Sequence, residues 1–148
     1  MKLGKLEQIT DLRSIWKHEA NDFTPWLAKE ENLAALSDAI GIELVLEEQE
    51  SNVGDFSVDL FATEEGTGRK VVIENQLEET NHDHLGKIIT YASGKDAEVI
   101  IWIVRKARDE HKKAIEWLNQ HTDDSSAFFL IEIEVWKIGN SEPAPKFN

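Results

Sequence analysis

The sequence has 148 residues, 41% of them apolar, and this length and composition suit one domain built around its own hydrophobic core. It contains no cysteine, which excludes disulfides, thiolate metal sites and cysteine nucleophiles. The net charge of −13 is uneven, since residues 1–86 hold 7 basic and 19 acidic groups and the remainder 9 and 10, so the acidic part repels phosphate and favours cations.

Two features bear on where the protein works. The longest apolar run, Val99 to Val104, is much shorter than the roughly 18 residues that a membrane-spanning helix needs. The opening segment MKLGKLEQIT has no apolar stretch behind its lysines, so it does not resemble a secretory signal. We therefore expect a cytoplasmic protein without a membrane partner.

The first part of the chain contains one ambiguous segment and one clear helix. Residues 5–19 have apolar side chains at a spacing compatible with either a helix or a short strand followed by a helix: Leu6, Ile9, Leu12, Ile15 and Trp16. From residue 24 a helix is predicted, because Thr24 can cap it and Pro25 suits its first position. Gly41 ends this helix, whose apolar face consists of Trp26, Leu33, Leu36 and Ile40.

Strands and helices then alternate along the chain. Strands are predicted at residues 43–48, 56–63, 70–76, 98–104 and 127–138, and a Gly-containing hairpin turn joins the second and third. Helices are predicted at residues 82–94 and 109–121. Residues 139–148 are expected to be a tail or the start of a linker. The order predicts a single α/β domain over residues 1–148, with a central mixed sheet flanked by helices.

The strongest chemical signal lies in the predicted hairpin. Side chains alternate along a strand, so Glu74 and Gln76 share one face, and the hairpin brings Asp59 beside Glu74. Two carboxylates in apolar surroundings are unfavourable unless a cation or a proton compensates them. This pair therefore predicts a divalent-metal site.

The segments VGDFSVDLFA and VVIENQLE, with the element order above, resemble the PD-(D/E)XK nuclease superfamily, whose restriction-endonuclease-like core is αβββαβ. The resemblance implies that Asp59, Glu74 and the carbonyl of Asn75 ligate Mg²⁺ or Mn²⁺. Gln76 stands where the family has a lysine, and the expected role of its amide is to orient the attacking water. A neutral amide cannot supply the positive charge of that lysine.

Two further features resemble the RecB-like branch of the superfamily. The segment KIITY matches its Q-x-x-x-Y motif, with Tyr91 present and Lys87 in place of Gln. Lys87 can return to the site the positive charge that position 76 lacks. The branch also has a glutamate on its first helix, for which Glu19 and Glu31 are both candidates, and Glu19 is preferred as an outer-sphere ligand because it precedes an apolar run.

Residues 17–138 also resemble an uncharacterised nuclease-like domain at the N-terminus of longer bacterial proteins, through GDFS, IENQLE and HDHLG, and the chain's ending is close to the APKFN of that family. The chain is then expected to be a fragment whose partners include a C-terminal domain. The function implied is metal-dependent phosphodiester hydrolysis in nucleic acid, with DNA the expected partner. The alternative is an inactive nuclease-fold module that binds nucleic acid or a protein, and a homo-oligomer stays open.

Three other patterns have a structural and a functional interpretation. His82 and His84 suggest zinc, but this segment more often caps a helix. Four tryptophans have core-facing spacing and are expected in the core: Trp26, Trp102, Trp117 and Trp136. The one dense basic cluster is expected to be a solvated helix face and is also the best candidate to contact DNA; it comprises Arg105, Lys106, Arg108, Lys112 and Lys113.

Overall fold

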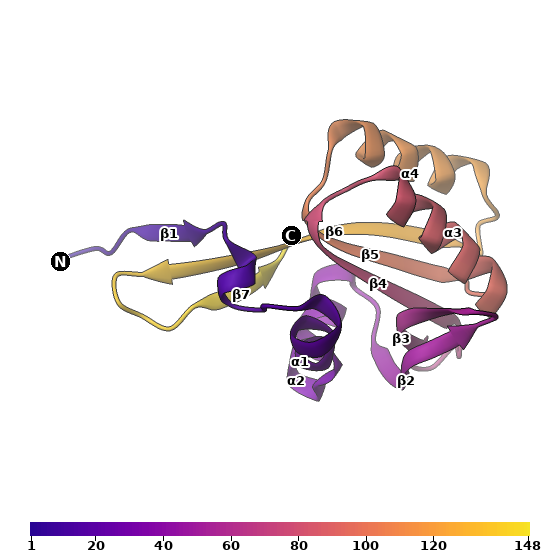
Figure 1. Cartoon of the computed structure of the whole chain (residues 1–148), viewed down its shortest axis with the longest axis horizontal. Helices are drawn as coiled ribbons and strands as arrows, with labels where there is room; N and C mark the ends of the chain where they lie inside the picture. The colour runs from indigo at the N-terminus through magenta and orange to yellow at the C-terminus, as the bar shows by residue number, and fades with distance from the viewer.

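A computed structural model describes the backbone of residues 1–148 and every side chain except that of Phe56. One seven-stranded sheet runs through the molecule in the order β1-β6-β5-β4-β3-β2, with β7 added to β6 (Figure 1). The strands are β1 (Leu6–Ile9), β2 (Leu44–Val53), β3 (Phe56–Glu64), β4 (Lys70–Glu79), β5 (Val99–Lys106), β6 (Ala127–Ile138) and β7 (Ala144–Phe147). The pairs β4–β5 and β5–β6 are parallel and the others antiparallel, so the predicted mixed sheet is confirmed.

Helices cover both faces of the sheet (Figure 1). On one face lie the 3₁₀-helix η1 (Leu12–Ser14), the π-helix η2 (Glu19–Phe23), α1 (Thr24–Ala28) and α2 (Glu30–Ile40). Their apolar side chains pack on a core that includes Leu60, Ile73 and Ile101. On the other face α3 (His82–Lys95) and α4 (Asp109–His121) pack on Val72 and Trp102. The two separate cores confirm the predicted α/β fold class.

The first helix differs from the prediction. Thr24 is not a cap, because its backbone is already helical (φ −60°, ψ −45°) and its buried hydroxyl accepts a hydrogen bond from Asn75 Nδ2 at 3.0 Å. The predicted single helix is also broken at Lys29, whose backbone is extended (φ −66°, ψ 141°). A contact made 51 residues away in sequence thus uses the hydroxyl that local sequence assigned to capping.

The other differences lie mainly at element ends. The ambiguous N-terminal segment forms β1 followed by η1. Strands β2 and β4 run beyond the predicted residues 48 and 76, because each continues to pair with its neighbour. Residues 139–148, expected to be a tail or linker, include β7, which is antiparallel to β6. The boundaries predicted for α4 and β6 agree with the structure.

Of the four tryptophans expected in the core, Trp102 and Trp117 differ most in solvent exposure. Trp102 is fully buried at the centre of the sheet. Trp117 is 57% exposed, so its placement in the core was wrong, and its ring stacks on His121 at a centroid distance of 4.3 Å. An apolar spacing on α4 did not distinguish the covered face from this exposed one. No helix of the described chain has the length and apolar character to cross a membrane.

Candidate active site

The β3–β4 pairing sets Asp59 opposite Glu74. Leu60 pairs with Ile73, and continuing that antiparallel register by one residue matches the two carboxylates. The backbone N–H of Asn75 donates a hydrogen bond to Asp59 Oδ2 at 2.8 Å, and the two carboxyl groups are close enough to shift each other's pKa. The sheet therefore brings together the two acids that the sequence analysis singled out.

Burial dominates the electrostatics of this pair. It raises the pKa of Asp59 to about 6, although the Asn75 N–H opposes the rise and the charges of Glu50 and Glu19 add to it. Burial, followed by the Asp59 charge, raises the pKa of Glu74 to about 9, and the nearby Lys87 charge opposes that rise. The folded chain therefore favours a proton or a cation between the two side chains.

The donor set fits a hard divalent cation. Glu74 is 8% exposed, and its Oε2 atom is buried without a hydrogen-bond partner. Among the described side chains, no three His, Cys, Asp or Glu groups form a metal-binding cluster, so an ion here would have two carboxylate ligands and would complete its shell with carbonyl and water oxygens. Mg²⁺ is commonly held by one or two carboxylates in this way.

The backbone and the side chain of Asn75 have different hydrogen-bond partners. Its N–H points to Asp59, and because the N–H and C=O of one strand residue face the same neighbour, its carbonyl also lies on the β3 side. Its side-chain Nδ2 reaches Thr24 on the opposite face of the sheet, and the side chain is buried there. The side chain is therefore directed away from Asp59, and the predicted ligand role concerns the backbone carbonyl.

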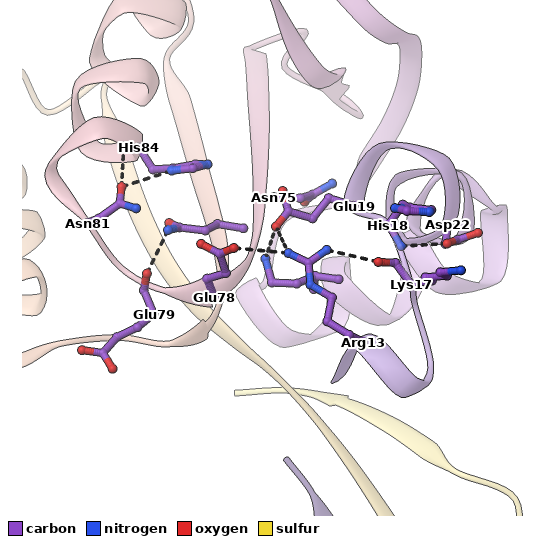
Figure 2. A network of polar contacts seen from close by, with 12 residues as sticks. Arg13, Lys17, His18, Glu19, Asp22, Asn75, Glu78, Glu79, Asn81 and His84 are labelled. Atoms are coloured by element: carbon purple, nitrogen blue, oxygen red, sulfur yellow. Dashed lines mark hydrogen bonds and ion pairs between the residues drawn. The ribbon is translucent and has the colours of Figure 1, made fainter. Parts of the chain in front are cut away.

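Glu19, and not Glu31, lies beside the end of β4. Its Oε1 atom accepts hydrogen bonds from the Leu77 N–H and from Arg13 Nη2, both at 2.9 Å (Figure 2). Glu31 is an exposed residue in the first turn of α2. The π-helix η2 starts at Glu19 and positions it over the sheet, close enough for its charge to raise the pKa of Asp59.

Arg13 is a residue of this site that sequence reasoning missed. Besides Glu19, its guanidinium contacts Glu78 Oε1 at 3.4 Å, so it bridges η2 and β4 (Figure 2). Arg13 lies in a 3₁₀ turn, six residues before Glu19 and 65 before Glu78. No local pattern marks such a bridge, and only the folded chain brings the three groups together.

Both ends of the Gln76 side-chain amide have hydrogen-bond partners within the fold. Gln76 is fully buried, its Nε2 donates to the Glu79 carbonyl at 2.8 Å, and its Oε1 accepts from Trp102 Nε1 at 3.1 Å. Both ends of the amide are therefore engaged in the core. The water-orienting role expected of this amide stays a prediction, and the structure adds that one acceptor site of its oxygen is already used by Trp102 on the neighbouring strand.

Helix α3 brings Lys87 and Tyr91 toward the same pair. The helix is capped by Asn81, whose Oδ1 accepts the His84 N–H at 2.9 Å. Lys87 is exposed, and its charge lowers the pKa of Glu74. Tyr91 is buried, and its pKa is raised by burial and then by the charges of Glu74 and Asp59. Both residues of the KIITY segment thus lie within electrostatic reach of the carboxylates.

The histidines of the HDH segment do not converge. His82 Nδ1 is 3.1 Å from His111 Nε2, whereas His84 Nδ1 is 3.1 Å from Asn81 Oδ1. His84 lies nearer the candidate site, and burial, followed by the Lys87 charge, lowers its pKa. The described residues therefore give no support to zinc binding by this segment.

The basic cluster lies at the entry to α4 and is partly neutralised. Arg108 forms ion pairs with Glu79 at 3.6 Å and Glu110 at 3.4 Å, and Lys112 lies 4.0 Å from Asp109. These residues border a polar cavity of about 320 Å³. Lys106 also borders it, so the surface keeps basic groups beside the paired ones.

Comparison with solved structures agrees with this architecture. A repair endonuclease from Pyrococcus abyssi is similar with a TM-score of 0.51 at 14% identity, over 69% of this chain and 45% of the endonuclease. An EndoMS complex with double-stranded DNA has a TM-score of 0.49 at 16% identity, over 71% of this chain and 45% of that one. No protein-family model and no curated protein sequence matches the chain.

The first of these similarities establishes a nuclease-like fold. At 14% identity it concerns the fold alone, and the match spans less than half of the endonuclease. The αβββαβ core expected from the sequence is therefore the architecture that the chain adopts.

Proposed function

We propose that this chain is a metal-dependent nuclease domain that hydrolyses phosphodiester bonds in DNA. The observation that carries the proposal is the buried Asp59–Glu74 pair, in which Glu74 Oε2 has no hydrogen-bond partner. A pair of adjacent carboxylates with raised pKa values is unfavourable for the fold alone, and such groups concentrate at functional sites. The nuclease-like fold supports this interpretation.

Each site residue has a separate role in the proposed reaction. Asp59, Glu74 and the Asn75 carbonyl hold Mg²⁺ or Mn²⁺, which when bound supplies Lewis-acid chemistry to a phosphate and its attacking water. Glu19 orients a water at the edge of the site. Arg13 fixes Glu19 by the ion pair at 2.9 Å.

Lys87 and Tyr91 complete the proposed site from α3. Lys87 is an exposed cation whose charge acts on Glu74. In the proposed reaction it stabilises the negative charge that develops on the phosphate. Tyr91 is buried beneath Lys87 and keeps this face of α3 against the carboxylates. The position of this Lys-x-x-x-Tyr pair supports assignment to the RecB-like branch.

The scissile strand is proposed to approach between α3 and η2, where Lys87 is exposed and the Arg13 side chain is 38% exposed. The basic cluster of α4 would then bind phosphates farther along the nucleic acid.

One observation favours a second function. Gln76 is committed to the core, so position 76 supplies no positive charge to the site. The alternative is an inactive nuclease-fold module that binds nucleic acid or a protein partner.

Calorimetric titration with Mn²⁺, combined with cleavage assays, distinguishes the two functions. We expect the parent to bind Mn²⁺ and to cleave DNA, and we expect Asp59→Asn and Glu74→Gln to lose both properties. Glu31→Gln is the matched control, since Glu31 is an exposed acid away from the pair. Metal binding without cleavage of single- or double-stranded DNA or RNA would favour the inactive module. Equal Mn²⁺ affinity in parent and both site variants would show that the metal site is misplaced.

A further inference from the structure

A second concave site lies on the opposite face of the sheet from Asp59 and Glu74. It is a groove of about 670 Å³ between α2 and β2, which follow one another in the chain and lie side by side (Figure 1). The α1 and α2 side of the sheet belongs to one core, whereas α3 and the catalytic face belong to the other. Occupancy of this groove therefore does not compete directly with the candidate active site.

The floor of the groove is apolar and partly open. Leu33 is buried beneath it, Leu44 and Leu46 pack at its side, and Val45 is 43% exposed. Ala34 is an exposed lining residue, so its small side chain leaves the groove wide. An apolar floor of this kind suits aliphatic side chains of a ligand.

Strand β2 is the last strand of the sheet, and in the described chain it pairs only with β3. Near its start, the Leu44 N–H donates to Ser37 Oγ of α2 at 3.1 Å, so the helix occupies the first edge position. Beyond Leu44, the edge of β2 that faces away from β3 has no strand partner in the described chain. Unpaired edge groups are the template for adding an extended peptide.

The rim of the groove is acidic. Four carboxylates line it, namely Glu30, Asp38, Glu43 and Glu65, and no basic side chain does. The Glu65 N–H donates to the Glu43 carbonyl at 2.9 Å, which holds the two acidic side chains together. The pKa of Glu43 is raised first by the hydrogen bond that its protonated carboxyl donates to Glu65, and then by the Glu65 charge, by partial desolvation and by the Asp38 charge. The folded chain thus maintains a repulsion that a cationic ligand relieves.

We propose that this groove binds a short extended segment of a partner protein, in which basic and aliphatic residues alternate. The segment adds to the free edge of β2, places its aliphatic side chains on the floor and directs its Lys or Arg side chains to the acidic rim. Charge complementarity selects a basic peptide, and the same carboxylates repel nucleic acid. The acidic excess of residues 1–86 then has a use apart from phosphodiester chemistry.

The test is an amide NMR titration of the ¹⁵N-labelled full chain with a blocked hexapeptide of alternating Lys and Val. We expect shifts confined to α2 and residues 41–46 and 65, with affinity that falls as salt rises. Alternating Glu and Val in the same length is the control peptide. Equal binding of both peptides, or shifts spread over all acidic surfaces, would overturn the proposal.

Two kinds of variant test the groove itself. Glu43→Gln with Glu65→Gln should weaken the basic peptide by about fivefold or more, whereas Glu116→Gln with Glu142→Gln removes equal charge elsewhere and should not. Ala34→Trp fills the groove without changing charge and should abolish binding while other amide shifts stay in place. Unchanged affinity in both groove variants, or groove shifts that depend on protein concentration without peptide, would refute a peptide occupant; the latter would indicate a second copy.

Discussion

The indole Nε1 of Trp102 donates a hydrogen bond to Gln76 Oε1 at 3.1 Å, which ties the departure from the nuclease motif to the packing of the neighbouring strand. Glu74 pairs with Trp102 across the β4–β5 ladder, so the indole lies beside the candidate metal ligand as well as over Gln76. The amide oxygen of Gln76 accepts a hydrogen bond from the buried indole N–H of Trp102. A lysine at position 76 has no acceptor atom for this N–H. The residue at position 76 therefore depends on the packing of Trp102 as well as on the candidate site.

Gln76→Lys is expected to destabilise the protein and to leave nuclease activity unrescued. The substitution removes the acceptor for Trp102 Nε1 and places a charge at a fully buried position, and an unsatisfied buried group alone costs about 1–3 kcal/mol. Urea unfolding measures the loss. Gln49→Lys, at an exposed position of β2, should change the unfolding free energy little. A Gln76→Lys protein that is as stable as the parent and more active would contradict this explanation.

The metal-free protein is expected to lose stability as pH rises from about 4 to 9. Burial raises the pKa of Asp59 from 3.8 to about 6 and that of Glu74 from 4.5 to about 9, so the folded state binds protons more tightly than the unfolded state. That contribution is full below the unfolded values and is lost through the folded ones. Glu74 has the larger of the two pKa shifts, and Glu74→Gln removes it. The unfolding free energy of the variant should therefore rise relative to that of the parent, by a few kcal/mol, as pH increases toward 9.

Chemical unfolding in chelator at pH 5, 7 and 9 measures that difference. Glu31→Gln serves as the control, because Glu31 is exposed and should follow the parent at every pH. If Glu74→Gln is less stable than the parent at pH 9, the pair stabilises the fold and its carboxylates are structural.

Lys87→Ala is expected to lower DNA cleavage by roughly a hundred- to thousandfold while Mn²⁺ affinity stays the same or rises slightly. A cation that meets developing phosphate charge acts in the transition state, whereas removal of its charge beside Glu74 does not remove a metal ligand. Cleavage rates at saturating metal and calorimetry provide the two measurements. Lys5→Ala, at an exposed position before β1, is the control. Parental cleavage by Lys87→Ala would make Lys87 an ordinary solvated helix residue.

Arg13→Ala is expected to lower activity by acting through Glu19. Arg13 and the Leu77 N–H both donate to Glu19 Oε1, so loss of the guanidinium frees the carboxylate to rotate. Losses of a supporting residue of this kind are about 10- to 100-fold. If Arg13 acts only by positioning the Glu19 carboxylate, the double variant Arg13→Ala with Glu19→Gln should cleave DNA no more slowly than Glu19→Gln alone. Additive losses in that cycle would mean that Arg13 acts on the substrate independently.

Local sequence was enough for the elements whose signals are strong and regular. The apolar run Val99 to Val104 predicted a central strand, because a strand covered on both faces is apolar throughout and a run of this length is short for a buried helix. Alternation along β3 and β4, with a short turn between them, was enough to set Asp59 near Glu74. The amphipathic pattern that begins at His82 specified α3 and, with it, the approach of Lys87.

Tertiary structure decided what depends on partners distant in sequence. Thr24 became a buried acceptor for Asn75 because α1 packs on β4, and Gln76 became part of the core because β5 brings Trp102 beside it. Glu19 was already preferred from the sequence, but its hydrogen bond from the Leu77 amide, 58 residues away, depends on the packing of η2 on β4. Periodicity reports which face of an element is apolar, but the hydrogen-bond partner of a polar group is fixed only when the strands and helices are packed together.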